Sequence, residues 1–291
     1  MSAAVLRVAA AQLALRAGDL DANLALHLDA VAEARARGVD LLVFPELSLT
    51  GYLAAPDLLT LGRGRDAPEL ARLAGTAGAM RVVAGFIEEA APGLFHNAAA
   101  LLDGTGILHV HRKLSLPTYG RLEEGRHYAA GSGVEAIDLG GGWRAGTLVC
   151  ADLWNPAYPW LAALAGATVL AAPVASARGV VAEGFDPAAG WATVATHTAA
   201  TYGLPTILCN GCGRGAEHPD GLDFWGGSRI LDPFGRVLAE AGSEPALLVA
   251  EFDLDAVRRA RTALPTVRDL DPRRVAAILE GRLRRDAAGS M

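Results

Sequence analysis

The stretch VLRVAAAQLALRAGDLDANLALHLDAVAEARARGVDLLVF, residues 5–44, decides the fold. Its two ends, residues 5–13 and 39–44, are apolar runs typical of buried strands. Between them, apolar residues recur at steps of four, four, three and three, which places on one helical face Leu20, Leu24, Leu28, Val31 and Ala34. Arginines and then Gly38 follow, as is typical of a helix C-terminus. Strand, helix and strand in this order predict a right-handed parallel crossover.

The alternation of strands and helices continues outward from this unit. After a helical region around residues 66–79, short apolar segments separated by turn residues predict hairpin-joined strands at 81–89, 97–103, 107–113 and 134–139. Strand and helix then alternate at 143–150, 158–166, 167–173, 190–203 and 205–210, and a final hairpin is expected around 231–235. The pattern predicts an α/β fold in a single domain, residues 1–272, with helices covering the sheets.

The C-terminal segment is rich in arginine from about residue 255 onward, and we treat residues 273–291 as a tail outside the domain. A run of charges of this kind is typical of a solvated helix, and it also suits an arm that clasps a partner chain. Both interpretations stay open at this point.

Composition and charge narrow the class of protein. Of the 291 residues, 52% are hydrophobic and 20% are charged, which is typical of a globular chain, and the net charge of -6 gives no reason to expect a nucleic-acid partner. The three cysteines, Cys150, Cys209 and Cys212, suggest no disulfide framework and favour a reducing compartment. The N-terminus lacks the basic start of a signal peptide, and no apolar run reaches the roughly 20 residues of a membrane helix. We therefore expect a soluble, cytoplasmic protein without a membrane partner.

Three apolar segments lead to a single reactive or charged residue and then to a turn. LLVFPELSLTGY carries Glu46, ILHVHRKLSLP carries Lys113, and GTLVCADLWNP carries Cys150. Each residue also has an ordinary explanation, because a free cysteine often completes a core strand and single charges often cap loops. In open α/β sheets, however, ligands bind beyond the strand ends, so these three side chains are candidates for one shared cleft.

The three residue types together suit acyl transfer. A thiol with a pKa near 8.5 is mostly protonated at neutral pH and needs a base to become a nucleophile. Glu46 follows the apolar residues Val43, Phe44 and Pro45, and it can be that base if desolvation raises its pKa. Lys113 supplies a positive charge where an oxyanion develops. The set predicts a reaction that passes through a thioester.

At this point the residues carry a family resemblance. FPELSLTGY, HRKLSLP and TLVCADLWNP, in that order, resemble the Glu-Lys-Cys triad of the nitrilase (carbon-nitrogen hydrolase) superfamily. The segment LEEGRHYAAG resembles the family stretch with a second glutamate, which aligns with Glu124 rather than Glu123. GATVLAAPVAS and FWGGSRILDPFGRVLAEAG are similar to later family segments, so the resemblance extends from residue 5 to about 272.

The resemblance implies a four-layer αββα sandwich that forms a homodimer or a higher homo-oligomer. It implies hydrolysis of a non-peptide C–N bond of a small amide, with no metal or organic cofactor. By analogy, Glu46 deprotonates Cys150 and later activates water, while Lys113 and the backbone N–H of Ala151 hold the oxyanion. Glu124 positions the substrate or Lys113, and ammonia or an amine leaves before the acid product.

The substrate is less constrained by the resemblance. Ala151, Trp154 and Tyr119 are expected to contact it, and Arg178 and Phe185 are further candidates for the pocket wall. Relatives often carry a larger residue at the position of Ala151, so an alanine leaves more room. The candidate substrates are a small linear amide, an ω-amide or an N-carbamoyl compound, with nitriles less expected.

Three alternative functions stay open. The segments CADLWNP and LPTYGRLEEGRHYAAG are similar to the glutaminase domain of glutamine-dependent NAD synthetase, which suggests a glutaminase that passes ammonia to a partner. A catalytically silent scaffold of the same fold is the second. A thiol–disulfide oxidoreductase that uses Cys209 and Cys212 is the third, although a single CxxC without further ligands is a weak signal.

Overall fold

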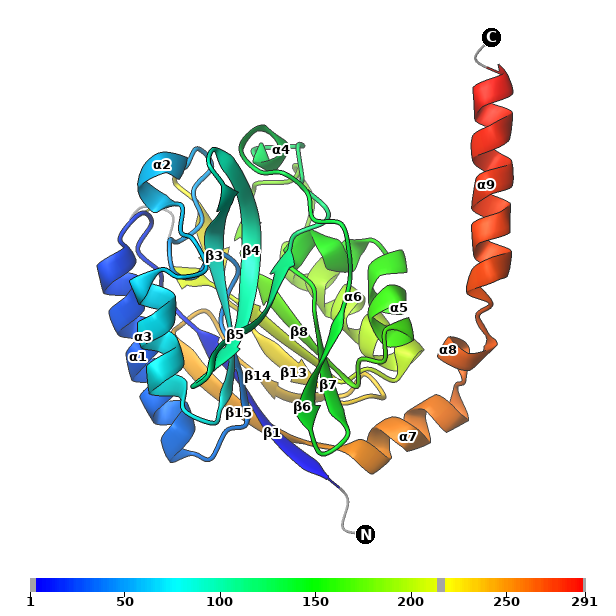
Figure 1. The fold of residues 1–291 in the computed structure, drawn as a ribbon, viewed down its shortest axis with the longest axis horizontal. Coiled ribbons are helices and arrows are strands. Elements are labelled where there is room, and N and C mark those ends of the chain that lie inside the picture. Colours follow the sequence, from blue (N-terminus) through cyan, green and yellow to red (C-terminus); the bar gives the residue numbers. More distant parts are fainter. Residues whose placement is uncertain (1–3, 214–217, 290–291) are drawn as a thin grey trace.

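A computed structural model describes residues 4–213 and 218–289 of the chain. This part forms two six-stranded sheets that pack face to face (Figure 1). In spatial order, the strands of the first sheet are β15 (Ala246–Asp253), β1 (Val5–Gln12), β2 (Leu41–Val43), β3 (Arg81–Ala91), β4 (Leu94–Asp103) and β5 (Gly106–Arg112). Those of the second sheet are β14 (Val237–Glu240), β13 (Arg229–Leu231), β10 (Thr206–Asn210), β8 (Val169–Val174), β7 (Trp143–Thr147) and β6 (Ala136–Gly140). A small third sheet contains β11 (Cys212–Gly213), β12 (Asp223–Trp225) and β9 (Ala177–Arg178).

The strand pairing confirms most of the predicted elements. β1 and β2 are parallel and are joined by helix α1 (Leu20–Ala36), which ends before Gly38, a residue with φ of +67°. The hairpins β3–β4, β4–β5 and β13–β14 are antiparallel, as expected. Strand β15 was not predicted. It pairs along its full length with β1, so the end of the domain returns to its beginning.

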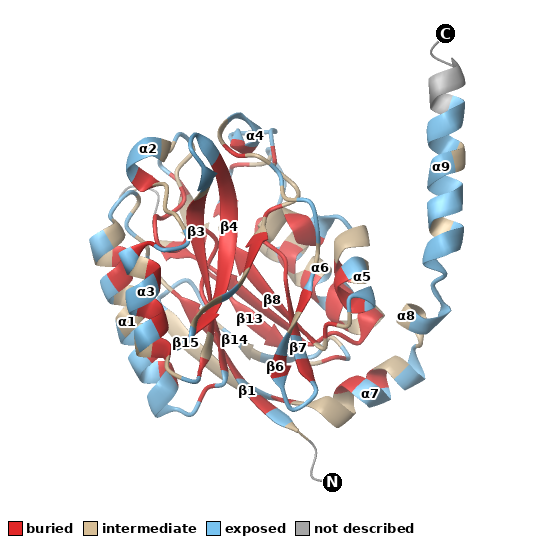
Figure 2. Ribbon diagram, in the orientation of Figure 1, coloured by how far each residue is buried: buried red, intermediate tan, exposed pale blue. Residues whose placement is uncertain are grey.

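Two pairs of helices cover the outer faces of the two sheets. Helices α1 and α3 (Pro68–Ala77) lie on the first sheet, and α5 (Ala157–Leu164) and α6 (Pro187–Tyr202) lie on the second (Figure 1). Along one strand, side chains alternate between the interface of the two sheets and the interface with the helices, because successive residues point to opposite faces of a sheet. In β1, Val8 and Ala10 pack between the sheets, and Ala9 and Ala11 pack under the helices. The buried strands between exposed helix surfaces in Figure 2 confirm the αββα sandwich.

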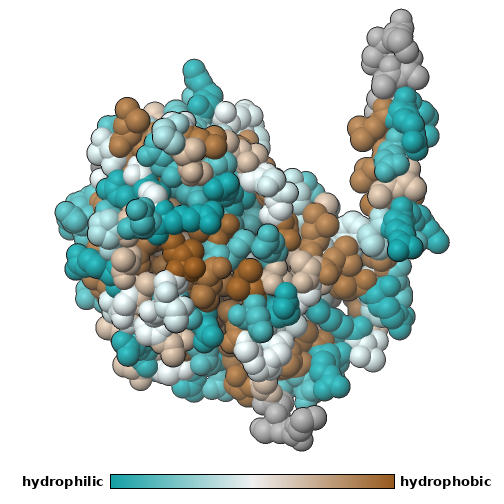
Figure 3. All heavy atoms as spheres, viewed as in Figure 1, coloured by the Kyte–Doolittle hydropathy of each residue, from teal (hydrophilic) through white to brown (hydrophobic). Residues whose placement is uncertain are grey.

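The C-terminal segment is helical and leaves the body of the molecule. Helix α7 (Leu254–Ala263) still packs against the sandwich through Val257 and Ala260. After α8 (Thr266–Asp269), helix α9 (Pro272–Gly289) stands away from the other elements and exposes Ile278, Leu279 and Leu283 (Figure 3). The arginine-rich tail is therefore helical, which is one of the two interpretations left open by the sequence, and the contact with a partner chain stays a prediction. Among the described helices, none has the length and apolar character needed to cross a bilayer.

Candidate active site

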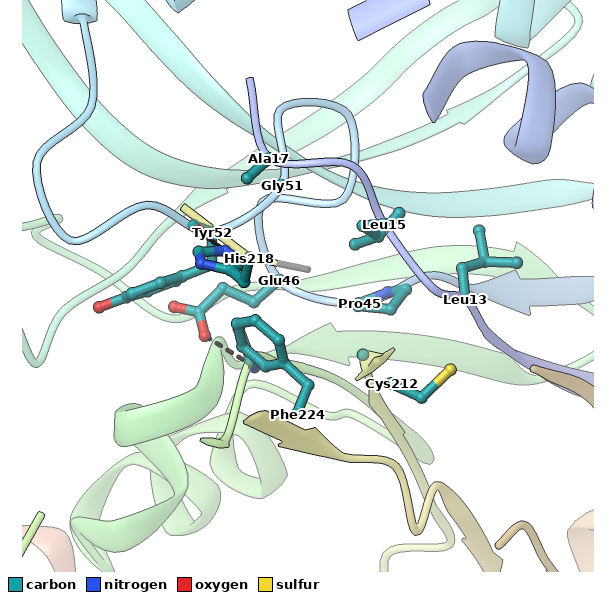
Figure 4. A pocket seen from close by; sticks show the side chains of 12 residues that line it. Leu13, Leu15, Ala17, Pro45, Glu46, Gly51, Tyr52, Cys212, His218 and Phe224 are labelled. Carbon is teal, nitrogen blue, oxygen red and sulfur yellow. Dashed lines mark hydrogen bonds between the residues drawn. The ribbon is translucent and has the colours of Figure 1, made fainter. Parts of the chain in front are cut away.

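Glu46 lies in a tight turn after strand β2. The chain passes so close to β3 that a Cβ atom on Gly85 would lie 2.2 Å from the backbone nitrogen of Leu47, so only glycine fits at position 85. The turn buries the carboxylate of Glu46 almost completely. Its Oε1 accepts hydrogen bonds from Lys113 Nζ at 2.6 Å and from Asn97 Nδ2 at 2.7 Å. Its Oε2 accepts from the backbone N–H of Ala175 at 2.9 Å, and Figure 4 shows Glu46 beside Tyr52.

Lys113 follows strand β5 and joins two carboxylates. Its side chain is fully buried, and Nζ donates to Oε1 of Glu46 and, at 2.8 Å, to Oε1 of Glu124. Burial alone lowers the pKa of Lys113, but the charges of Glu124 and Glu46 outweigh that effect and hold the pKa well above its usual range. The site therefore contains a permanent cation.

Glu124 begins the short helix α4 (Glu124–His127). Its carboxylate accepts hydrogen bonds from other side chains besides Lys113. The hydroxyl of Tyr52 donates to Oε1 at 2.9 Å, and Asn97 Nδ2 lies 3.5 Å from Oε2. Burial raises the pKa of Glu124 to about 7, with Lys113 opposing this shift and Glu46 adding to it. Glu124 therefore changes its charge near neutral pH.

This titration predicts a pH dependence of stability. Because the pKa of Glu124 rises from 4.5 to about 7 on folding, the native state binds the proton more tightly. The resulting stabilisation is complete below pH 4.5 and is lost as the pH rises through about 7. In the wild type, the unfolding free energy should therefore fall between about pH 5 and about pH 8. In Glu124→Gln, which lacks the titrating group, this fall should be smaller by about 1–3 kcal/mol, as measured by urea denaturation at each pH.

The exposed neighbour Glu123 provides the matched control. Its carboxylate pairs only with the exposed Arg126 among the contacts that the structure shows, so Glu123→Gln should keep the wild-type pH dependence. Equal pH dependence in the wild type and Glu124→Gln would contradict the assignment.

Cys150 lies in the turn after β7, and here the predicted strand 143–150 is too long. The strand ends at Thr147, and Cys150 begins the 3₁₀ helix η1 (Cys150–Trp154) with φ of +46°. A non-glycine residue rarely adopts this left-handed conformation, and strained residues of this kind cluster at active sites. Burial and the negative charge of Glu46 raise the pKa of the Cys150 thiol well above its usual range, and Lys113 opposes this. The resting residue is thus a thiol that needs a base.

The carboxylate of Asp152 connects the turn that contains Cys150 to the segment around Lys113 through hydrogen bonds. Its Oδ1 accepts from the backbone N–H groups of the two residues after Lys113, at 2.9 and 2.7 Å. Its Oδ2 accepts from the N–H of Val149 at 3.1 Å and from Nε2 of His111 at 3.0 Å, where the ring nitrogen donates because a carboxylate only accepts. Asp152 is fully buried and links the segments that hold Cys150 and Lys113.

Removal of the Asp152 carboxylate should be costly. Asp152→Ala leaves several buried donors without an acceptor, each at about 1–3 kcal/mol, so we expect the unfolding free energy to fall by about 3 kcal/mol or more. Asp138 is the control, because this exposed aspartate accepts only a local turn hydrogen bond from Gly140. Asp138→Ala should cost less than about 1 kcal/mol. Similar losses for the two variants in denaturant titrations would argue against the linking role.

Glu124 and Cys150 both line a pocket of about 270 Å³. The pocket wall includes the predicted contact residues Ala151, Trp154 and Tyr119, and it also includes Phe185. Glu46 and Lys113 are buried behind this wall: Lys113 donates to Glu124, which lines the pocket, and also to Glu46. Arg178, the other candidate, lies elsewhere: it lines a separate hollow and faces Asp223 at 3.8 Å.

The two cysteines of the CxxC sequence do not have the environment of redox-active thiols. Both are buried and free. Burial raises the pKa of Cys212 to about 12 and that of Cys209 well above its usual range, whereas reactive thiols have a lowered pKa. Cys212 lines a cavity of about 10 Å³ that also touches Glu46, but its side chain points away from Glu46 (Figure 4). The geometry therefore gives the oxidoreductase alternative no support.

Sequence reasoning missed Asn97, Tyr52 and the pair His111–Asp152. Asn97 had a usable signal, because it is a polar residue at the start of the apolar segment 97–103 and its burial requires a partner. The functional role of Lys113 is also indicated by composition, since it is the only lysine among the 26 Lys and Arg residues. Among the described residues, no group of three or more His, Cys, Asp or Glu side chains is placed to hold a metal ion.

Known proteins are similar to this chain in sequence and fold. A family model described as carbon-nitrogen hydrolase matches residues 7–262. The (R)-stereoselective amidase of Pseudomonas sp. is 33% identical over 268 residues, which are 91% of this chain and 91% of that protein. The glutamine-dependent NAD(+) synthetase of Thermotoga maritima is 31% identical over 280 residues, and the match covers 92% of this chain but only 44% of the synthetase.

A solved structure extends the comparison to the fold. The crystal structure of a carbon-nitrogen hydrolase from Helicobacter pylori G27 superimposes with a TM-score of 0.80 at 26% sequence identity, over 91% of this chain and 95% of that one. The chain therefore belongs to the carbon-nitrogen hydrolase family of the nitrilase superfamily, and it is an enzyme that acts on C–N bonds other than peptide bonds.

Proposed function

We propose that this enzyme hydrolyses a small amide through a thioester on Cys150. The observation that carries the proposal is the single buried ammonium of Lys113, held at 2.6 and 2.8 Å between Glu46 and Glu124 beside a pocket that contains Cys150. This arrangement supplies a nucleophile, a candidate base and a fixed positive charge, and the base and the cation are almost completely buried. The products are a carboxylic acid and ammonia or an amine.

The first half of the reaction forms the thioester. Glu46 takes the proton of the Cys150 thiol as the sulfur attacks the amide carbon, and the raised pKa of this thiol is the reason that a base is needed. Negative charge then develops on the former carbonyl oxygen, where Lys113 and the backbone N–H of Ala151 stabilise it. The C–N bond breaks, and the nitrogen leaves with the proton from Glu46.

The second half regenerates the enzyme. Glu46 removes a proton from water, and the hydroxide attacks the thioester carbon through a second oxyanion at the same donors. The C–S bond breaks, the acid leaves, and the proton returns to the sulfur. Glu124 keeps Lys113 in place during both halves, because Oε1 of Glu124 accepts from Lys113 and from Tyr52.

A glutaminase that delivers ammonia to a partner is the second candidate. It uses the same thioester chemistry, and the similarity to the glutamine-dependent NAD(+) synthetase of Thermotoga maritima favours it. The two candidates differ in the acyl group that the pocket accepts and in the fate of the ammonia.

The test is the release of ammonia and acid from a panel of compounds. The panel contains glutamine, asparagine, simple aliphatic amides, ω-amides and N-carbamoyl amino acids. The proposal predicts equimolar ammonia and carboxylic acid from at least one of the simple amide classes. A folded protein that releases neither product from any class would contradict the proposal and would favour the silent scaffold.

A further inference from the structure

One wall of the active-site pocket is a packed group of aromatic rings. Trp154 lies against Phe185, with ring centroids 5.9 Å apart, and against Trp191 at 5.3 Å in an edge-on arrangement. Trp154 and Phe185 remain 40% and 37% exposed, so their surfaces are open to a ligand. All three rings line the pocket, and Tyr119 adds a fourth. The wall therefore offers a large apolar surface.

Helix α6 is shaped to receive these rings. Gly190 lies in the first turn of this helix, where glycine forms helix less readily than alanine. A Cβ atom on Gly190 would lie 2.9 Å from Cη2 of Trp154 and 3.2 Å from Cζ of Phe185, so a larger residue would displace the wall. The glycine indicates that the position of the rings is built into the fold.

The other lining residues of the pocket include several aliphatic side chains and carry little charge. Leu122, Val180 and Val181 line it, and among the described lining residues Glu124 is the only acidic or basic side chain. Its carboxylate already accepts from Lys113 and Tyr52. An α-amino acid amide would bring an ammonium and a carboxylate into this space, and burial of such charges without partners is strongly unfavourable.

A neighbouring hollow adds room for a bulky acyl group. The pocket alone has a volume of about 270 Å³, just below the roughly 300–1,000 Å³ found for sites that bind small organic molecules. A more open hollow adjoins it, and the two share Tyr119, Ala151 and Trp154. The small side chain of Ala151 leaves this connection open beside the nucleophile. A longer acyl group can therefore extend outward.

We propose that the enzyme selects uncharged amides with a bulky apolar, preferably aromatic, acyl group, and that it discriminates against glutamine. This inference rests on the proposed amide hydrolysis and names its substrate class. Transfer of an apolar ring from water to the wall formed by Trp154, Phe185 and Trp191 supplies the preference. The discrimination follows because the one acidic residue among the described lining residues, Glu124, is already paired with Lys113 and Tyr52, and no basic residue lines the pocket to pair with a carboxylate.

The direct test compares kcat/KM for propionamide, 3-phenylpropionamide, glutamine and the cationic 6-aminohexanamide. We expect 3-phenylpropionamide to exceed propionamide by roughly tenfold to a hundredfold, and glutamine to fall roughly a hundredfold below 3-phenylpropionamide. Equal values for propionamide and 3-phenylpropionamide would overturn the inference. So would glutamine or 6-aminohexanamide as the best substrate, because aromatic walls can also bind cations.

A pair of phenylalanine variants locates the preference. Phe185→Ala should lower the ratio of kcat/KM for 3-phenylpropionamide over propionamide by about tenfold. Phe234 is the matched control, since it is equally exposed, at 39%, and lies in the turn before β14, away from the pocket. Phe234→Ala should keep both the activity and the ratio of the wild type. An unchanged ratio in Phe185→Ala would show that the aromatic wall does not select the substrate.

Binding measurements separate this inference from the proposed function. In Cys150→Ser, tryptophan fluorescence should report tighter binding of 3-phenylpropionamide than of propionamide, because Trp154 and Trp191 line the pocket. If the binding preference is found while the wild type hydrolyses no amide, the pocket inference holds and the proposed function fails. If both amides are hydrolysed with no preference in binding or turnover, the proposed function holds and the pocket inference fails.

Discussion

Cys150→Ala is expected to reduce amide hydrolysis by about ten-thousandfold or more, because loss of the nucleophile removes the covalent route entirely. The fold should survive. Cys150 is small, it is only partly buried, and alanine removes the sulfur without placing a new atom in the pocket. Alanine also tolerates the turn no worse than cysteine does at φ of +46°. The measurement is ammonia release with the best amide of the panel, together with the thermal unfolding midpoint.

Cys212→Ala is the matched control for that experiment. Its thiol is buried outside the pocket, and Figure 4 shows it directed away from Glu46. We expect this variant to keep wild-type turnover. Activity that survives in Cys150→Ala but is lost in Cys212→Ala would transfer the chemistry to the CxxC sequence and refute the thioester on Cys150.

Lys113→Met is expected to affect both activity and stability. Turnover should fall by about a hundredfold or more, since one donor to the oxyanion is lost. The unfolding free energy should fall by about 3–5 kcal/mol, because Glu46 and Glu124 are then buried without a cation. Lys113→Arg should not restore turnover, since a planar guanidinium cannot replace a compact ammonium between two carboxylates.

A double variant separates the two effects of Lys113. Lys113→Met combined with Glu124→Gln leaves one buried carboxylate instead of two, so it should recover part of the lost stability. It should not recover turnover. Wild-type stability in Lys113→Met would contradict the structural role of Lys113, and turnover within about twofold of wild type would contradict its role as a donor to the oxyanion.

The layers of the fold and the reactive residues could be predicted from the sequence because both produce local sequence patterns. The alternation in residues 5–44 predicts the first crossover, and the sites at Glu46, Lys113 and Cys150 each follow a strand. Pairing between distant segments leaves no such pattern. Strand β15 joins β1 across more than two hundred residues, and nothing in its own sequence identifies that partner.

The hydrogen-bond network around the site was also beyond local reasoning. Tyr52 and Asn97 donate to Glu124 and Glu46 only because the loop after β2, strand β4 and helix α4 converge in the fold. Asp152 could be recognised as a turn residue, but three of its four donors come from the distant residues 111–115, and only the N–H of Val149 is local. Tertiary contacts, rather than propensities, give these residues their roles.

The most direct test of the mechanism is the identification of the acylated residue. The p-nitrophenyl ester of 3-phenylpropionic acid acylates rapidly because its leaving group is good, so the acyl-enzyme should accumulate before hydrolysis. Peptide mass spectrometry after a rapid acid quench should find one acyl group, on the peptide that contains Cys150, and none in Cys150→Ala. Acylation at another residue, or labelling that persists in Cys150→Ala, would contradict the thioester mechanism.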